Sequence, residues 1–271
     1  MSETVPAQDL WHQRTAPLPH ALLDVDTGPG ARVVVTLADR HRRPDLGYVA
    51  DGRAASPEDR RRLASALDLE PHRLVFMEQV HGIQVADVVS DHAGAGLAGR
   101  ATSVPGADAM VAGDRSLALV GLSADCPLVA LWDGRAGLAG LAHAGWRGLA
   151  GGILGKLAAR LIDRGADLPS LTGAVGPCIG PCCYEVGPDV LSAMAASGAA
   201  RAAQYVRRRE NGRTTLDLRG VALDQLREAG IDCRRVAVYP PCTMCRSDLF
   251  HSYRRDGAVA GRQAMAVRLR G

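Results

Sequence analysis

The sequence LALVGLSADCPLVALWDGRAGLAGLAH, residues 117–143, contains three short apolar runs that indicate the fold class. The runs are Leu117–Leu122, Leu128–Trp132 and Gly137–His143, and the segments between them contain Asp, Gly and Pro. Apolar runs of this length, bounded by turn-forming residues, are typical of buried β-strands. The stretch therefore predicts three consecutive strands joined by short turns.

Outward from this stretch, the same criteria identify further strands and several helices. A helix begins at Ser56 and Pro57, because a serine side chain caps free N–H groups and proline fits the first helical turn. We predict the other strands at residues 32–37, 74–77, 84–89, 108–111, 173–175, 235–239 and 264–269, and helices at residues 57–68, 149–164, 188–196 and 218–229. The strands come in runs and most helices come late, which predicts an α+β fold.

The length of 271 residues is compatible with one domain, which we place at residues 31–271. Residues 1–30 carry little periodicity. We expect them to form an N-terminal extension that is partly loose, with Trp11 docked on the domain.

The composition excludes several classes of protein. Hydrophobic residues make up 47% and charged residues 23%, which excludes a disordered chain. A net charge of +3 is too small for an obvious nucleic-acid-binding protein. The longest apolar stretch, Leu117 to Trp132, is broken by Asp125 and is shorter than the roughly 20 residues of a membrane span. Without a signal peptide, we expect a cytoplasmic monomer with reduced thiols.

Four polar segments follow predicted strands, at residues 79–82, 123–127, 143–148 and 242–245. Within them, His81, Cys126 and His143 are suited to share one zinc ion, because catalytic zinc takes three nitrogen or sulfur ligands and keeps one position for water. Zinc lowers the pKa of that water to about 7. The alternative is that each is structural: a hydrogen-bonded histidine or a small buried thiol. No short ligand spacing links the three, so the residues alone leave both interpretations open.

The turn around Arg147 is a candidate anion site. Gly145, Gly148, Gly151 and Gly152 allow a sharp strand-to-helix turn that exposes helix N–H groups, and a guanidinium beside it can bind phosphate or carboxylate. The alternative is close packing with a solvated Arg147. The pattern is neither GxGxxG nor a P-loop, so it supports neither dinucleotide nor ATP binding.

These residues together resemble the YfiH/laccase-domain proteins, also called the purine nucleoside phosphorylase or polyphenol oxidase family. The matching motifs run in order from about residue 30 to the C-terminus: Gln79-Val80-His81-Gly82, Ala107-Asp108-Ala109, Ala124-Asp125-Cys126-Pro127, His143-Ala144-Gly145-Trp146-Arg147-Gly148, Gly176-Pro177-Cys178-Ile179-Gly180, Tyr184-Glu185-Val186-Gly187, Cys242-Thr243, Phe250-His251-Ser252-Tyr253-Arg254-Arg255 and Gly261-Arg262.

The resemblance implies a mononuclear site in which His81, Cys126 and His143 hold zinc. Copper is also reported at this site in such proteins. It implies a mixed β-sheet sandwich flanked by helices, similar to toxin-type cysteine deamidases. The implied activities are phosphorolysis of adenosine, inosine and methylthioadenosine, and deamination of adenosine. We therefore expect a zinc enzyme whose small-molecule substrates are a purine nucleoside and phosphate. The main alternative is a hydrolase that edits UDP-muramoyl-serine, a nucleotide-sugar amino acid of peptidoglycan synthesis.

The same resemblance nominates further site residues. Asp125 and Arg147 are catalytic candidates, although for Asp125 we favour the alternative of a turn aspartate. The substrate-binding candidates are Gln79, Arg40, Arg147 and Arg254. The family's Arg-x-Gly-Gly-hydrophobic-Ser segment is missing after the first strand, where ADRHRRP stands at residues 38–44, and Arg40 is the candidate that replaces it at the pocket rim.

Other interpretations of the same residues remain open. Cys126 with His143 as base would form a metal-free cysteine hydrolase, although such a dyad needs no second imidazole. A mononuclear copper polyphenol oxidase is another, whereas a multicopper cluster is disfavoured because the eight histidines contain no His-x-His pair. A structural zinc in a binding module would need a fourth ligand, for which Cys242 and His251 are candidates.

Five further cysteines need an interpretation: Cys178, Cys182, Cys183, Cys242 and Cys245. Cys183 and Glu185, followed by Pro241-Cys242-Thr243-Met244-Cys245, imitate a cytidine-deaminase pattern. Glu185 precedes its helix, and the two segments lie too far apart for one βαβ unit, so we disfavour that enzyme. We interpret the five as reduced packing thiols, with an accessory zinc on Cys242 and Cys245 as the alternative.

Overall fold

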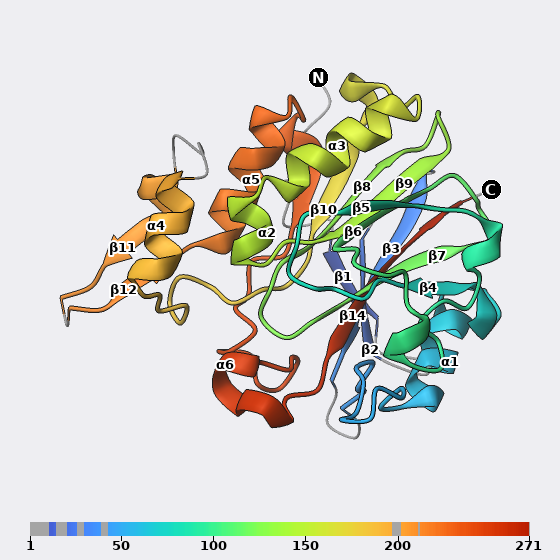
Figure 1. Cartoon of the computed structure of the whole chain (residues 1–271), viewed down its shortest axis with the longest axis horizontal. Helices are drawn as coiled ribbons and strands as arrows, with labels where there is room; N and C mark the ends of the chain where they lie inside the picture. The colour runs from blue at the N-terminus through green and yellow to red at the C-terminus, as the bar shows by residue number, and fades with distance from the viewer. Residues whose placement is uncertain are drawn as a thin grey trace.

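The computed structural model describes residues 11–14, 21–25, 30–38, 43–196, 202–210 and 212–270. They form two six-stranded mixed sheets packed face to face, with helices on both outer faces (Figure 1). A first apolar core lies between the sheets, and two further cores lie under the helices on either side. The expected α+β sandwich flanked by helices is confirmed.

The first sheet is antiparallel except for its β4–β7 pair, which is parallel. Its strand order is β1 (Trp11–Arg14), β2 (Ala21–Val25), β3 (Ala31–Leu37), β14 (Gln263–Leu269), β7 (Ala118–Ser123) and β4 (Leu74–Phe76).

The second sheet has a parallel pair at each edge and an antiparallel centre. Its order is β13 (Val236–Val238), β10 (Thr172–Val175), β8 (Leu128–Asp133), β9 (Leu138–His143), β6 (Ala109–Ala112) and β5 (Val85–Val88). A small hairpin of β11 (Val206–Arg208) and β12 (Thr214–Leu216) projects from the main body beside helix α4 (Pro188–Ala196; Figure 1).

The helices cover the two outer faces. Helix α1 (Pro57–Ala66) packs on the first sheet, and Ser56 caps it by accepting the Asp59 N–H, as predicted. The second sheet is covered by α2 (Trp146–Ala150), α3 (Ile153–Asp163), α5 (Leu218–Glu228) and, farther out, α4 (Pro188–Ala196). A short helix, α6 (Tyr253–Asp256), precedes β14.

The stretch quoted first forms β7, β8 and β9, as predicted, but its three strands divide between the two sheets. The turn at residues 123–127 carries the chain from β7 in the first sheet to β8 in the second. The segment between β4 and β5, residues 77–84, also carries the chain from the first sheet to the second. Both polar segments therefore lie where the chain passes between sheets, and this brings them together.

The structure differs from the sequence prediction at several elements. The helix predicted over residues 149–164 is two helices, because Gly152 takes a left-handed conformation (φ 76°) that interrupts α2 and α3. Inside the segment predicted as a partly loose extension, β1 and β2 extend the first sheet next to β3. The hairpin β11–β12 and helix α6 were not predicted. Among the described residues, no helix combines the length and apolar character that crossing a membrane requires.

Candidate metal centre and pocket

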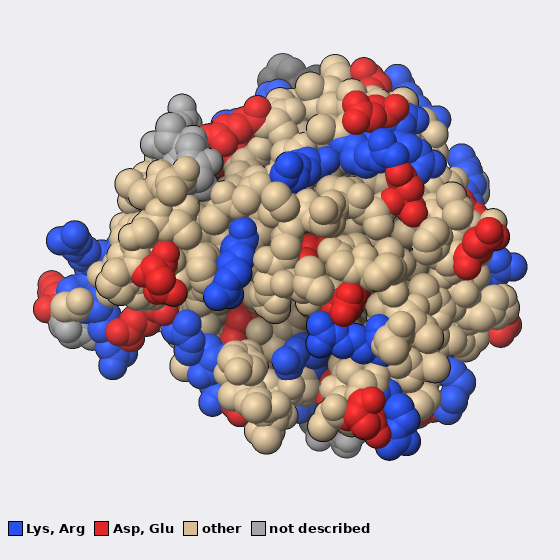
Figure 2. Space-filling model, viewed as in Figure 1, with Lys and Arg blue, Asp and Glu red and all other residues tan. Residues whose placement is uncertain are grey.

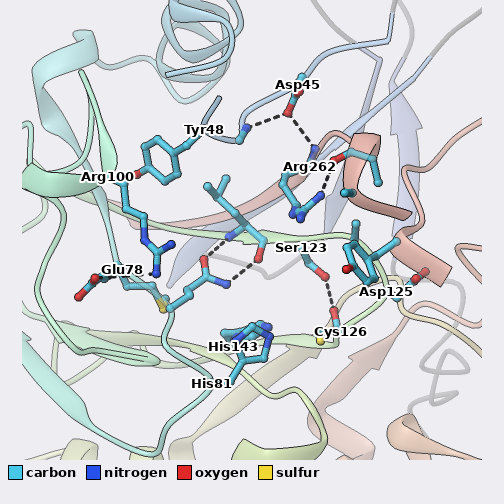
Figure 3. A pocket seen from close by; sticks show the side chains of 18 of the residues that line it. Asp45, Tyr48, Glu78, His81, Arg100, Ser123, Asp125, Cys126, His143 and Arg262 are labelled. Carbon is cyan, nitrogen blue, oxygen red and sulfur yellow. Dashed lines mark hydrogen bonds and ion pairs between the residues drawn. The ribbon is translucent and has the colours of Figure 1, made fainter. Parts of the chain in front are cut away.

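His81, Cys126 and His143 converge, as predicted, although they are distant in sequence. Each offers a ligand atom, and these atoms all lie within 4.8 Å of one another. The two imidazole rings are 4.9 Å apart between centroids and nearly perpendicular. Figure 3 shows them together beside the Cys126 sulfur at one end of a pocket. Three donors so placed can hold one metal ion, and all three side chains line the same pocket.

Strand pairing places two of the three ligands. His143 is the last residue of β9 and pairs with Leu128, the first residue of β8. Cys126 lies two residues before Leu128, in the turn that crosses between sheets, and is therefore next to His143. Gly145 favours this close approach, because a Cβ at that position would lie 3.0 Å from the Cys126 sulfur, which is tighter than an ordinary contact.

Asp108 positions the other ligand and orients His143. Its carboxylate accepts the backbone N–H groups of Val80 (3.1 Å), His81 (3.0 Å) and Gly82 (2.6 Å), and it lies 2.9 Å from Nδ1 of His143. Because Nδ1 is engaged by the carboxylate, Nε2 is the nitrogen left to bind a metal. Sequence reasoning matched Asp108 only as part of a family motif and did not place it in the site.

The site is electrostatically coupled. Burial raises the pKa of the Cys126 thiol, but the imidazoles of His143 and His81 outweigh it and bring that pKa to about 6. Burial lowers the pKa of His143, but the Cys126 sulfur and the Asp108 carboxylate outweigh it and raise that pKa to about 9. The thiolate, which is the metal-binding form, is therefore favoured near neutral pH.

The three ligands open into a pocket of about 880 Å³. Figure 2 shows that this face of the molecule is hollowed in its lower half, with basic side chains around the hollow. The pocket lining includes three arginines and three tyrosines: Arg100, Arg254, Arg262, Tyr48, Tyr184 and Tyr253. Such a lining suits a ligand with an anionic group and a flat ring.

The pocket rim near Tyr48 is held by a buried arginine. Arg60 donates to the carbonyls of Leu46 (2.7 Å), Gly47 (3.0 Å) and Leu97 (2.9 Å), and its guanidinium lies 4.5 Å from the Tyr48 ring centroid. Because Arg60 belongs to helix α1, these contacts attach the chain segments around residues 46–47 and around residue 97 to that helix.

Two predicted site residues line the pocket but have their polar atoms engaged within the protein. The Gln79 amide donates to the carbonyl of Leu122 (2.6 Å) and accepts its N–H (2.7 Å). The Asp125 carboxylate accepts the hydroxyls of Thr243 (2.6 Å) and Ser252 (3.0 Å) and the N–H of Arg254 (2.7 Å). Both side chains therefore hold the pocket walls together. For Asp125 these contacts, and its positive φ of 96°, favour the alternative of a turn aspartate.

The predicted arginines separate into three cases. Arg254 lines the pocket, donates to the Glu185 carbonyl (2.8 Å) and lies 5.1 Å from the Tyr184 ring centroid. Arg147 is exposed and stacks on Trp146 at 4.2 Å, and it is not among the lining residues, so the expected contact with the pocket is not seen. Arg147 is nevertheless close enough to act electrostatically on the hydroxyl of Tyr184, which lines the pocket. Arg40 lies outside the described residues.

A second group forms from Cys182, Cys183, Cys242 and Cys245, whose sulfur atoms lie within 4.8 Å of one another. The objection that these segments lie too far apart was wrong, because parallel pairing of β10 with β13 brings the loops after both strands to one sheet edge. Glu185 is outside the group, and its carboxylate lies 3.5 Å from Arg213, so the cytidine-deaminase constellation is incomplete.

The fourth ligand that a structural zinc at the first site would need is not found among the described residues. Cys242 belongs to the second group, and His251 is buried with its Nε2 at 2.9 Å from the Pro44 carbonyl. Among the described residues, the first group therefore offers three candidate ligands, the number that catalytic zinc sites use.

Comparison with known proteins identifies relatives along nearly the whole chain. The family described as multi-copper polyphenol oxidoreductase laccase matches residues 42–270. The purine nucleoside phosphorylase YlmD of Geobacillus stearothermophilus is 38% identical over 244 residues, covering 86% of this chain and 89% of its own. Its crystal structure aligns with a TM-score of 0.85 at 31% identity, over 97% of this chain and 99% of that one.

Two other relatives show the range of the group. The crystal structure of the Bacillus licheniformis hypothetical protein YfiH aligns with a TM-score of 0.86 at 25% identity, covering 96% of this chain and 99% of that one. A protein named adenosine deaminase RL5, from an unknown prokaryotic organism, is 29% identical over 215 residues, covering 79% of this chain and 82% of its own. Sequence, fold and site thus agree, and the chain belongs to the laccase-like YfiH family.

Proposed function

We propose that the protein is a zinc-dependent enzyme acting on purine nucleosides, with phosphorolysis as its main reaction. The observation that carries the proposal is the convergence of His81, Cys126 and His143 at the end of an open, arginine-lined pocket. The names of its relatives, purine nucleoside phosphorylase and adenosine deaminase, supply the substrate class.

The donor set fits zinc. Two imidazole nitrogens and one thiolate are preferred zinc ligands, and the contact of Asp108 with Nδ1 of His143 is the outer support common to such sites. Zinc supplies Lewis-acid chemistry when bound, since it polarises nearby atoms and lowers the pKa of water. Copper binds the same donors, so metal supply decides between the two ions as much as affinity does.

The pocket side chains fit the two substrates of phosphorolysis. A phosphate oxygen attacks C1′ of the ribose, the N-glycosidic bond breaks, and the base leaves as it takes up a proton. Guanidinium groups bind phosphate in a fixed orientation, and Arg254 is the candidate we favour because it lines the pocket beside Tyr184. Tyrosine rings can stack on the purine.

The proposal is tested by offering purified zinc-loaded protein inosine or adenosine, each with and without phosphate. We expect release of the free base and ribose 1-phosphate only when phosphate is present, together with slower conversion of adenosine to inosine. The same preparation is offered UDP-muramoyl-serine and a phenolic substrate. Turnover of either one with no release of a purine base would contradict the proposal.

Replacing Arg254 with alanine is expected to raise the KM for phosphate about tenfold, because a bound phosphate loses a charge-assisted hydrogen bond. Arg147→Ala tests the competing candidate, since the exposed Arg147 stacks on Trp146 and is not among the residues that line the pocket. Its KM for phosphate should change by less than about twofold. A large effect from Arg147→Ala and none from Arg254→Ala would reverse the assignment and restore the glycine turn as the anion site.

A further inference from the structure

The four-cysteine group lies on two loops that follow neighbouring strands. The Cys182 and Cys245 sulfurs are 3.7 Å apart and those of Cys183 and Cys245 are 3.4 Å apart. All four sulfur atoms lie within 4.8 Å of one another, and all four cysteines are free thiols. Two are exposed, so the group is accessible from the surface.

The fold holds the two loops in register. Beyond the parallel β10–β13 pair, Cys178 and Cys242 form a bridge, and the Thr243 N–H donates to the Cys178 carbonyl (3.1 Å). The first loop then turns tightly, since the Cys183 and Tyr184 N–H groups both donate to the Gly180 carbonyl (3.0 Å). The cysteines are therefore placed by the backbone of the sheet edge and not only by their own contacts.

The Cys242 sulfur is surrounded by N–H donors. The Gly180 N–H donates to it at 3.1 Å, and the N–H groups of Met244 and Cys245 also interact with it. Gly180 allows this approach, because a Cβ there would lie 3.2 Å from the Cys242 Cβ and from the Cys182 sulfur. Backbone N–H groups aimed at a sulfur favour its thiolate form, which is the metal ligand.

We propose that Cys182, Cys183, Cys242 and Cys245 form a second metal site, a closed tetrahedral centre for zinc with four sulfur ligands. Zinc–sulfur bonds of about 2.3 Å in a tetrahedron place the sulfur atoms about 3.8 Å apart, close to the separations found here. Four protein ligands leave no open position, so this ion is structural.

Three arginines bond to the loops that carry the cysteines or to the residues just before them. Arg209 donates to the Pro181 carbonyl (2.9 Å) and Arg255 to the Met244 carbonyl (3.3 Å), both on the loops that carry the cysteines. Arg219 lies 3.6 Å from the Cys178 sulfur and 3.4 Å from the Pro241 carbonyl. These bonds hold the loops in place around the cysteine group.

The second ion would brace the wall of the first pocket. The two loops that carry the cysteines also contact Asp125. The Thr243 hydroxyl donates to the Asp125 carboxylate (2.6 Å), and the Ile179 N–H donates to the Asp125 backbone carbonyl (2.8 Å). Ile179 lines the pocket, and so does Tyr184, the residue that follows Cys183. Cross-linking the loops therefore fixes the wall that faces the catalytic metal.

The proposal is tested by measuring bound zinc after loading the reduced full-length protein and removing excess metal. We expect about two zinc ions per chain in the wild type and about one in both Cys182→Ser/Cys245→Ser and Cys126→Ala. Cys233→Ser is the control, because that thiol lies outside both groups, and it should retain about two. Equal zinc content in the wild type and the double variant would overturn the proposal.

A spectroscopic measurement keeps the test decisive if the double variant folds poorly. Cobalt-loaded Cys126→Ala should show the intense thiolate-to-metal absorption of a tetrahedral four-sulfur site, whereas absence of that absorption contradicts it. Alkylation of the denatured, metal-stripped wild-type protein should label all seven of its cysteines. Protection of Cys182 or Cys183 together with Cys245 would instead indicate a disulfide. These readouts involve no substrate, so their failure would leave the proposed function standing.

Discussion

Replacing Cys126 with alanine is expected to lower kcat/KM for inosine phosphorolysis by at least about a thousandfold, or about 4 kcal/mol of transition-state stabilisation. The physical reason is that the only thiolate among the three ligands is lost, and the two remaining imidazoles hold zinc weakly. Zinc content and steady-state kinetics are measured on the same preparation. Cys233→Ala, which removes a half-buried thiol that contacts the Leu223 carbonyl, should keep its activity.

The same variant does not by itself exclude a cysteine nucleophile, because a dyad of Cys126 and His143 also needs the thiol. His81→Ala and exhaustive chelation separate the two mechanisms. The metal account predicts that both treatments abolish activity and that added zinc restores the chelated wild type. Full activity after chelation, or in His81→Ala, would favour the metal-free dyad.

Replacing Asp108 with asparagine is expected to weaken zinc binding at the first site by about 10- to 100-fold. An asparagine cannot accept all three N–H groups of residues 80–82 while also accepting the proton on Nδ1 of His143. The loop carrying His81 has positive φ at Gln79 (59°) and at His81 (62°), so it depends on these bonds. Competition with a chromophoric chelator measures the change in affinity.

Asp133→Asn is the matched control for Asp108→Asn. Asp133 is also buried and accepts three backbone N–H groups, from Arg135 (2.9 Å), Ala136 (3.1 Å) and Asp167 (2.9 Å). It lies at the opposite end of β8 from the metal ligands. We expect both variants to lower the free energy of unfolding by about 2 kcal/mol, but only Asp108→Asn to weaken zinc binding. Equal zinc affinities in the two variants would contradict the role given to Asp108.

The central strands could be predicted because their chemistry is local. Strands β7, β8 and β9 are buried on both faces and therefore read as continuous apolar runs between turn residues. Strand β1 was missed because WHQR, residues 11–14, is mostly polar and shows no such run. The break between α2 and α3 depends on the backbone angle of Gly152, which composition does not reveal.

The site could be predicted in part for the same reason. Residue chemistry nominated His81, Cys126 and His143, but their convergence depends on chain crossings between the sheets. The role of Asp108 could not be inferred, since it rests on backbone N–H groups that meet only in the folded loop. The four-cysteine group likewise depends on the parallel pairing of β10 with β13, a neighbour relation that no short motif encodes.

An anomalous difference map at the zinc absorption edge, from crystals of the zinc-loaded protein, tests the first metal site most directly. The account predicts a peak at about 2.0–2.3 Å from the ligand atoms of His81, Cys126 and His143, with a solvent molecule completing the coordination on the pocket side. No anomalous peak at these three side chains, or a fourth protein ligand closing the site, would contradict it.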